Sequence, residues 1–155
     1  MTSLAFCADK QTAVVREAAS GDTLVLDSGK TLKLIGIAAP SAAGKDSLTR
    51  QYASASQEFL NTLAAGKTIR IEWAPQIRDN RNNLLAYCFL EDGTFINKSI
   101  LLAGNAKLKS VPPNTQYEAS FRKASYDAQK KKRGLWEKEP DNPLHVRIVH
   151  RRTRV

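Results

Sequence analysis

The sequence is poor in the residues from which enzymes most often build metal or nucleophilic centres. Its 155 residues include two cysteines, Cys7 and Cys88, and no Cys-x-x-Cys pair. The two histidines, His145 and His150, are five residues apart, so a strand would place them on opposite faces. No glycine-rich phosphate loop is present, and no Ser–His–Asp arrangement can be argued. These absences speak against a zinc centre, a P-loop and a serine hydrolase site.

The sequence also lacks a long hydrophobic run. No apolar segment approaches the ~20 residues that a membrane-spanning helix needs, so no membrane span is expected. Residues 3–9 resemble the end of an export signal but are too short to be one, which suggests a periplasmic or secreted protein. Cys88 lies in an apolar segment and is interpreted as a small core residue. Cys7 could pair with it only in an oxidising compartment.

What the chain does have is positive charge, unevenly placed. The net charge is +9, and residues 122–155 hold 11 lysines and arginines against 4 acids. Such an asymmetry favours a polyanion or an acidic protein surface as partner. The alternative is a solvated basic helix followed by a disordered tail. With 42% hydrophobic residues, the chain is expected to form one domain with a sizeable core.

The N-terminal half reads as β-structure organised around a hairpin. A first strand begins near Thr12 and leads into the hairpin. In the stretch 19–26, Asp22 stands at the entry to a strand in which Leu24 and Leu26 alternate with their neighbours, and after a turn at 27–30 the answering strand covers 31–40. Pro40 ends the answering strand, because proline donates no ladder hydrogen bond. Strands are also expected at 68–73 and 84–90.

Three helices are predicted between and after these strands. The first follows a cap at Asp46 or Ser47, and the short second spans residues 98–103 after a cap at Asn97. Thr115 to Glu118 forms a capping-box pattern that opens the third. The expected buried faces are Leu48, Tyr52, Ala55, Phe59 and Leu63 in the first helix, and Tyr117, Phe121, Ala124 and Ala128 in the third.

Four short motifs occur in a characteristic order: Gly21-Asp22-Thr23, Arg78-Asp79-Asn80 before Leu85-Ala86-Tyr87, Phe95-Ile96-Asn97, and Gly134-Leu135-Trp136. Together they resemble the staphylococcal nuclease (thermonuclease-like) family over residues 12–137. The resemblance implies an α+β, mainly β fold, a five-stranded OB-type barrel with three α-helices. We therefore predict an N-terminal arm (1–11), a nuclease-like domain (12–138) and a basic C-terminal extension (139–155), which could add an edge strand or be a tail ordered only on binding.

The resemblance also implies phosphodiester cleavage assisted by Ca²⁺, with a defined set of site positions. The first metal-binding aspartate falls on Asp22 and is kept. The other positions carry replacements: the second carboxylate falls on Ala38, the carbonyl ligand on Ala39, the catalytic glutamate on Ser41, and the two arginines on Lys33 and Asn83. Alanine offers no side-chain oxygen, serine is a poor proton acceptor near neutral pH, and lysine lacks the bidentate fork of arginine.

These replacements predict a catalytically degenerate barrel that acts as a binding module for nucleic acid or protein, as a monomer and without a cofactor. The base-stacking tyrosines of the family are also missing, so binding of nucleic acid should be weak and salt-sensitive. The candidate contacts are Lys33, Arg78, Arg81, Lys107 and Lys109. Asp22 would then anchor the hairpin by accepting backbone hydrogen bonds.

Two alternatives remain open. The chain could be an active Ca²⁺-dependent nuclease for DNA or RNA whose ligands have moved, with Asp46 and Arg81 as the replacement acid and cation. It could also be a pure protein-interaction domain whose basic tail docks an acidic partner.

Overall fold

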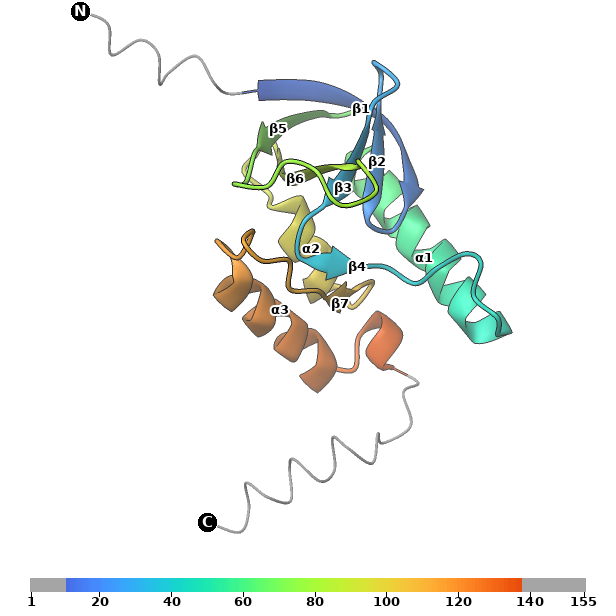
Figure 1. Ribbon diagram of the computed structural model, residues 1–155. Coiled ribbons are helices and arrows are strands. Elements are labelled where there is room, and N and C mark those ends of the chain that lie inside the picture. The colour runs from blue at the N-terminus through green and yellow to red at the C-terminus, as the bar shows by residue number, and fades with distance from the viewer. Residues whose placement is uncertain (1–10, 138–155) are drawn as a thin grey trace, which may run out of the picture.

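The computed structural model describes residues 11–137 and contains a closed five-stranded barrel with strand order β1-β2-β3-β6-β5 (Figure 1). The predictions for the N-terminal arm, the C-terminal extension, Cys7, His145 and His150 fall outside these residues. The barrel strands are β1 (Gln11–Ser20), β2 (Thr23–Leu26), β3 (Thr31–Leu34), β5 (Thr68–Glu72) and β6 (Leu84–Leu90). The predicted mainly β fold with an OB-type barrel is therefore confirmed.

Strand β1 closes one side of the barrel because it pairs with two strands, β5 and β2. Its first residues, 11–14, pair with β5, and residues from Val15 to Ser20 pair with β2. Register shifts in the second half bend the strand, as β-bulges do. The opposite side is closed by a parallel pairing of β3 with β6. The inward residues of these strands form the core, with Leu24, Leu32 and Ile69 each at most 1% exposed.

The predicted strand over residues 31–40 is in fact two strands. Strand β3 ends at Leu34, and the chain turns at Gly36, whose φ is +87°. A Cβ at this position would lie 2.5 Å from the Phe121 ring, so only glycine fits both the backbone angle and the space. After the turn, β4 (Ile37–Ala38) leaves the barrel and pairs with β7 (Lys107–Leu108) in a separate two-stranded sheet.

Helix α1 (Ser47–Ala64) is present, but the predicted buried face is wrong. The buried residues are Ala53, Ser56, Leu60 and Ala64, whereas Leu48 is 42% exposed. Small residues are buried because the helix approaches the barrel very closely: a Cβ on Gly21 would overlap Ser56. The larger Phe59 and Leu63 pack at the flank of this seam and are half-buried.

Helix α2 (Ile96–Leu102) begins one residue before the predicted cap, so Asn97 does not cap it. Asn97 is fully buried instead. Its amide nitrogen donates to the carbonyls of Ile35 and Ala86, and its oxygen accepts from the backbone N–H of Cys88. The side chain thus links β6 to the turn after β3 by hydrogen bonds to buried backbone groups of both.

Helix α3 (Glu118–Lys130) buries Phe121, Ala124 and Ala128, as predicted, together with Ser125. The predicted capping box does not form, because no side chain caps the helix; Glu118 instead accepts from Arg122 at 2.6 Å. A short 3₁₀ turn, η2 (Gly134–Trp136), follows, and Trp136 lies beside Lys107 of β7, 5.6 Å from the ring centroid to Nζ. Within residues 11–137, no helix is long and apolar enough to cross a membrane.

Candidate functional site

Asp22, which the sequence resemblance assigns to a metal-binding position, lies in the turn between β1 and β2 and is held by three hydrogen bonds. Its Oδ1 accepts from the hydroxyls of Ser20 (2.8 Å) and Thr23 (3.0 Å). Its Oδ2 accepts from the backbone N–H of Ala39 at 3.0 Å. A carboxylate has about four lone-pair sites, so little acceptor capacity is left for a metal ion.

The end of β4 brings Ala38, Ala39 and Ser41 next to this turn. Ala38 and Ala39 are half-buried, and neither side chain carries an oxygen. Ser41 is exposed, and its hydroxyl accepts from the N–H of Ala43 at 3.1 Å. The cross-strand neighbour of Ala38 in β7 is Lys107, so a cationic side chain stands opposite the position of the family's second carboxylate.

Asp79 organises the polar loop at 78–83. Its carboxylate accepts from the backbone N–H groups of Arg81 and Asn83, both at 2.9 Å, and from the Asn83 side chain at 3.1 Å. It also pairs with Lys33 across 3.9 Å. Desolvation opposes the charge of Asp79, but the hydrogen bonds from Asn83 and Arg81 and the nearby Lys33 outweigh it and lower the pKa of this carboxyl.

Lys33 and Asn83, which the sequence resemblance assigns to the family's two arginine positions, are therefore brought together around one acid. Of these two residues only Lys33 carries a positive charge, and the negative charge of Asp79 offsets it. Sequence reasoning used Asp79 merely as part of a motif and missed this role. The signal was available, because a lone aspartate near the start of a six-residue polar loop is well placed to accept backbone N–H groups.

The remaining basic candidates are spread over two places. Arg78 and Arg81 are exposed in the β5–β6 loop, and the Arg78 guanidinium donates to the carbonyl of Asn82 at 3.0 Å. Lys107 and Lys109 are exposed on and beside β7. The backbone N–H of Lys109 donates to the carbonyl of Gly36 at 2.9 Å, which ties this segment to the turn before β4.

The candidate for a replacement acid, Asp46, is committed to capping α1. Its oxygens accept from the backbone N–H of Thr49 (2.7 Å) and from the Thr49 hydroxyl (2.6 Å), and these bonds lower the pKa of the exposed carboxyl. Asp46 therefore performs the ordinary work of a helix N-cap.

The residues present do not fit a Ca²⁺ ion, which wants about six to eight oxygen ligands, several from carboxylates. Asp22 has both oxygens engaged, and its neighbours in β4 contribute no side-chain oxygen. Among residues 11–137, no group of three or more histidine, cysteine, aspartate or glutamate side chains is placed to hold a metal ion.

Comparison with known proteins relates the chain to nucleases. Residues 31–138 match the family model described as staphylococcal nuclease homologue. The thermonuclease of Staphylococcus intermedius is 28% identical over 128 residues, covering 81% of this chain and 76% of that protein. The thermonuclease of Staphylococcus hyicus is 29% identical over 132 residues, covering 83% and 78%. With the closed barrel and the matched order of its motifs, the chain belongs to the staphylococcal nuclease homologue family.

Proposed function

We propose that this family member binds single-stranded nucleic acid through its basic surfaces and does not cleave it. The observation that carries the proposal is the hydrogen bonding of the Asp22 carboxylate. The only acid retained at the nuclease-like site accepts hydrogen bonds on both oxygens, one of them from the backbone of Ala39. An acid used in this way joins the β1–β2 turn to the end of β4 and is a poor ligand for a catalytic cation.

The residues around Asp22 lack the groups that phosphodiester cleavage needs. Cleavage of a phosphodiester needs a positioned base for the attacking water and cations for the developing charge. Ser41 replaces the expected base, and the charge of Lys33 is offset by Asp79. Loss of a single such group typically costs about 10²–10³ in rate, and here several are replaced together.

The positive charge of the protein favours binding of nucleic acid. The chain has a net charge of +9, and exposed cations lie in the β5–β6 loop, on β7 and at the end of α3. Lysine and arginine side chains that contact phosphates release condensed counterions, so the affinity should fall steeply with salt. The lack of tyrosines in the loops near Arg81 and Lys109 favours recognition of the backbone over recognition of a base sequence.

The test pairs a cleavage assay with a binding assay. A 5′-labelled single-stranded oligonucleotide should stay intact with the protein in 10 mM Ca²⁺, at about the rate seen with a chelator. The same oligonucleotide should bind in a fluorescence anisotropy titration, with an affinity that falls as salt rises. Ca²⁺-dependent cleavage that disappears in Asp22→Ala would overturn the proposal in favour of an active nuclease. No binding at low salt would instead direct the search to an acidic protein partner.

A further inference from the structure

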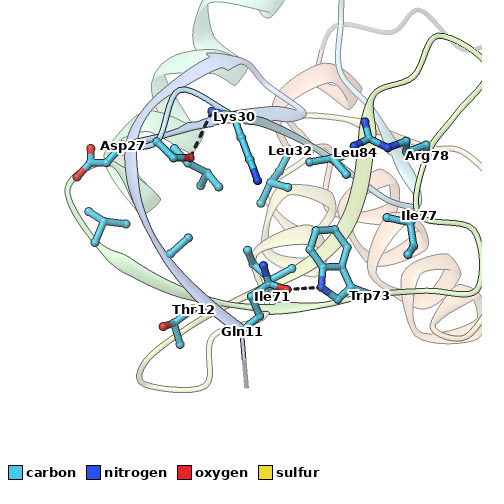
Figure 2. Close-up of a pocket in the computed structure, with 14 residues that line it drawn as sticks. Gln11, Thr12, Asp27, Lys30, Leu32, Ile71, Trp73, Ile77, Arg78 and Leu84 are labelled. Carbon is cyan, nitrogen blue, oxygen red and sulfur yellow. Dashed lines mark hydrogen bonds between the residues drawn. The ribbon is translucent and has the colours of Figure 1, made fainter. Parts of the chain in front are cut away.

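The barrel has an open end, distinct from the nuclease-like site, that contains a cavity of about 540 Å³ (Figure 2). It lies between the first residues of β1, the β2–β3 turn, the end of β5 and the start of β6. Its floor is apolar and continuous with the core, with Leu26, Leu32 and Ile71 at the bottom. The volume is within the range of small-molecule sites, and barrel mouths are among the usual places for such sites.

Exposed apolar side chains gather at this mouth. Of the four large apolar residues that are exposed within residues 11–137, two line the cavity: Val14, 39% exposed, and Ile77, 48% exposed. Trp73 adds an aromatic wall. Its indole N–H donates to the side-chain oxygen of Gln11 at 2.6 Å, which fixes the ring at the edge of the opening (Figure 2).

Two cations complete the lining. Lys30, from the β2–β3 turn, extends toward the space that the Trp73 ring also faces, and Arg78 lies on the β5–β6 side (Figure 2). Asp27 is the single acid among the lining residues, so the mouth carries a net positive charge. An apolar floor, an aromatic wall and a cationic rim together suit a ligand with a planar, largely apolar ring and an attached anion.

We propose that the barrel mouth, defined by Val14, Lys30, Ile71, Trp73, Ile77 and Arg78, binds one unpaired nucleotide of a single strand. The base would lie in the mouth against Trp73, and the adjacent phosphates would meet Lys30 and Arg78. Stacking on an aromatic ring beside a cationic groove is how barrels commonly bind single strands without reading their sequence. This inference rests on the proposed function and gives it a second contact surface that contains the aromatic ring missing from the nuclease-like site.

The experiment compares two matched variants of the full-length protein. Ile77→Asp places a negative charge at the mouth, and Leu48→Asp makes the same change at a similarly exposed position in α1, away from the cavity. Affinity for a fluorescent oligothymidylate is measured by anisotropy at low salt. Ile77→Asp should weaken binding about tenfold, the effect expected from losing one stacked base, and Leu48→Asp should leave it near the wild-type value.

A second measurement locates the base directly. The chain has two tryptophans, so Trp136→Phe identifies the Trp73 indole N–H signal in a ¹⁵N NMR spectrum. That signal should shift and saturate on titration with the oligonucleotide. Lys30→Gln should reduce the magnitude of the salt slope by about 0.7, as expected for one lost phosphate contact to a single strand.

The outcomes distinguish failure of the proposed function from failure of the mouth proposal. If no oligonucleotide binds the wild-type protein, the proposed function fails as well. If binding is retained in Ile77→Asp and the Trp73 signal does not move, nucleic acid binds elsewhere and the mouth proposal is overturned. The mouth proposal would equally fail if binding weakened in Ile77→Asp while the Trp73 signal never responded to the oligonucleotide, because no base would then lie against this ring.

Discussion

The backbone N–H of Ala39 donates to the carboxylate of Asp22 across 3.0 Å, and this bond links the β1–β2 turn to the end of β4. In the nuclease-like arrangement the same two positions would face a metal ion. Here they face each other. Asp22 therefore holds the backbone of the β4 end in place.

Replacing Asp22 tests whether the acid is structural. Asp22→Ala removes an acceptor of three hydrogen bonds, one of them from a backbone group, and should reduce the free energy of unfolding by about 1–3 kcal/mol. Urea denaturation provides the measurement. The wild-type protein should unfold at the same urea concentration with and without millimolar Ca²⁺, since a ligand that binds the native state would stabilise it. A Ca²⁺-dependent rise in stability that Asp22→Ala abolishes would contradict this account.

Protonation of Asp79 should release the loop at 78–83. Because the folded-state pKa of this carboxyl is lowered, its stabilising contribution is present above the ordinary value of 3.8 and is lost as the pH falls through the folded-state pKa. We expect the amide signals of Arg81 and Asn83 to shift together below pH 3.8 in NMR spectra. In Asp79→Asn these shifts should be absent. Independent titration of the two amides would argue against a shared acceptor.

A second prediction for Asp79 concerns whether Lys33 is available to contact the phosphates of a nucleic acid. Asp79→Asn removes the charge that offsets Lys33 at 3.9 Å, so the affinity for single-stranded nucleic acid should rise, by up to about tenfold at low salt. Anisotropy titrations of this variant and of Asp92→Asn make a matched pair, because Asp92 is an exposed acid in the distant turn after β6. An equal rise in both variants would indicate an effect of net charge alone.

Asn97 should be the most costly amide to remove. Asn97→Ala leaves the carbonyls of Ile35 and Ala86 and the N–H of Cys88 without this partner inside the protein, and a destabilisation of about 3 kcal/mol or more is expected. The exposed Asn80 is the control, and Asn80→Ala should change stability by less than about 0.5 kcal/mol. Thermal or urea unfolding distinguishes the two. Similar small effects in both variants would mean that water replaces the buried amide.

The close approach of α1 to the barrel gives a prediction about Gly21. A Cβ there would lie 2.8 Å from the Cβ of Ala39 and closer still to Ser56, so Gly21→Ala should destabilise the protein by about 1–3 kcal/mol. Gly29, in the exposed β2–β3 turn, has open space around it but a φ of +88°. Gly29→Ala should therefore lower the free energy of unfolding by a smaller amount, through backbone strain alone. Unfolding curves of the two variants make the comparison. A smaller loss at Gly21 than at Gly29 would show that α1 can move away.

The barrel could be predicted from the sequence because its strands alternate and its turns carry the usual residues. Leu24 and Leu26 face the core as their spacing indicated, and β6 begins and ends at the predicted residues. The face of α1 was predicted wrongly because the spacing of the apolar residues was taken as the guide to burial. At this tight helix–barrel contact, three of the four buried residues of α1 are the small Ala53, Ser56 and Ala64, and only the three-dimensional spacing selects them.

The site was harder to predict than the fold. The sequence predicts that Ala38 and Ala39 offer no side-chain oxygen to a metal ion, and this prediction of a degenerate site still awaits the cleavage assay. It did not reveal the pairing of Lys33 with Asp79, because these residues are far apart in the chain and meet only through the β3–β6 pairing. The open barrel end was missed for the same reason, as Val14, Lys30 and Trp73 belong to three separate segments.

The parallel pairing of β3 with β6 has a consequence for the order in which the molecule assembles. It joins residues about fifty positions apart, such as Leu32 and Leu84, whereas the β2–β3 hairpin joins residues at most ten apart. Local hairpins can form early, but closure must wait for the slow search that brings distant segments together. A chain emerging from the ribosome therefore cannot close its barrel until β6 has been made, and until then the edges of β3 and β5 are open to pairing with other chains.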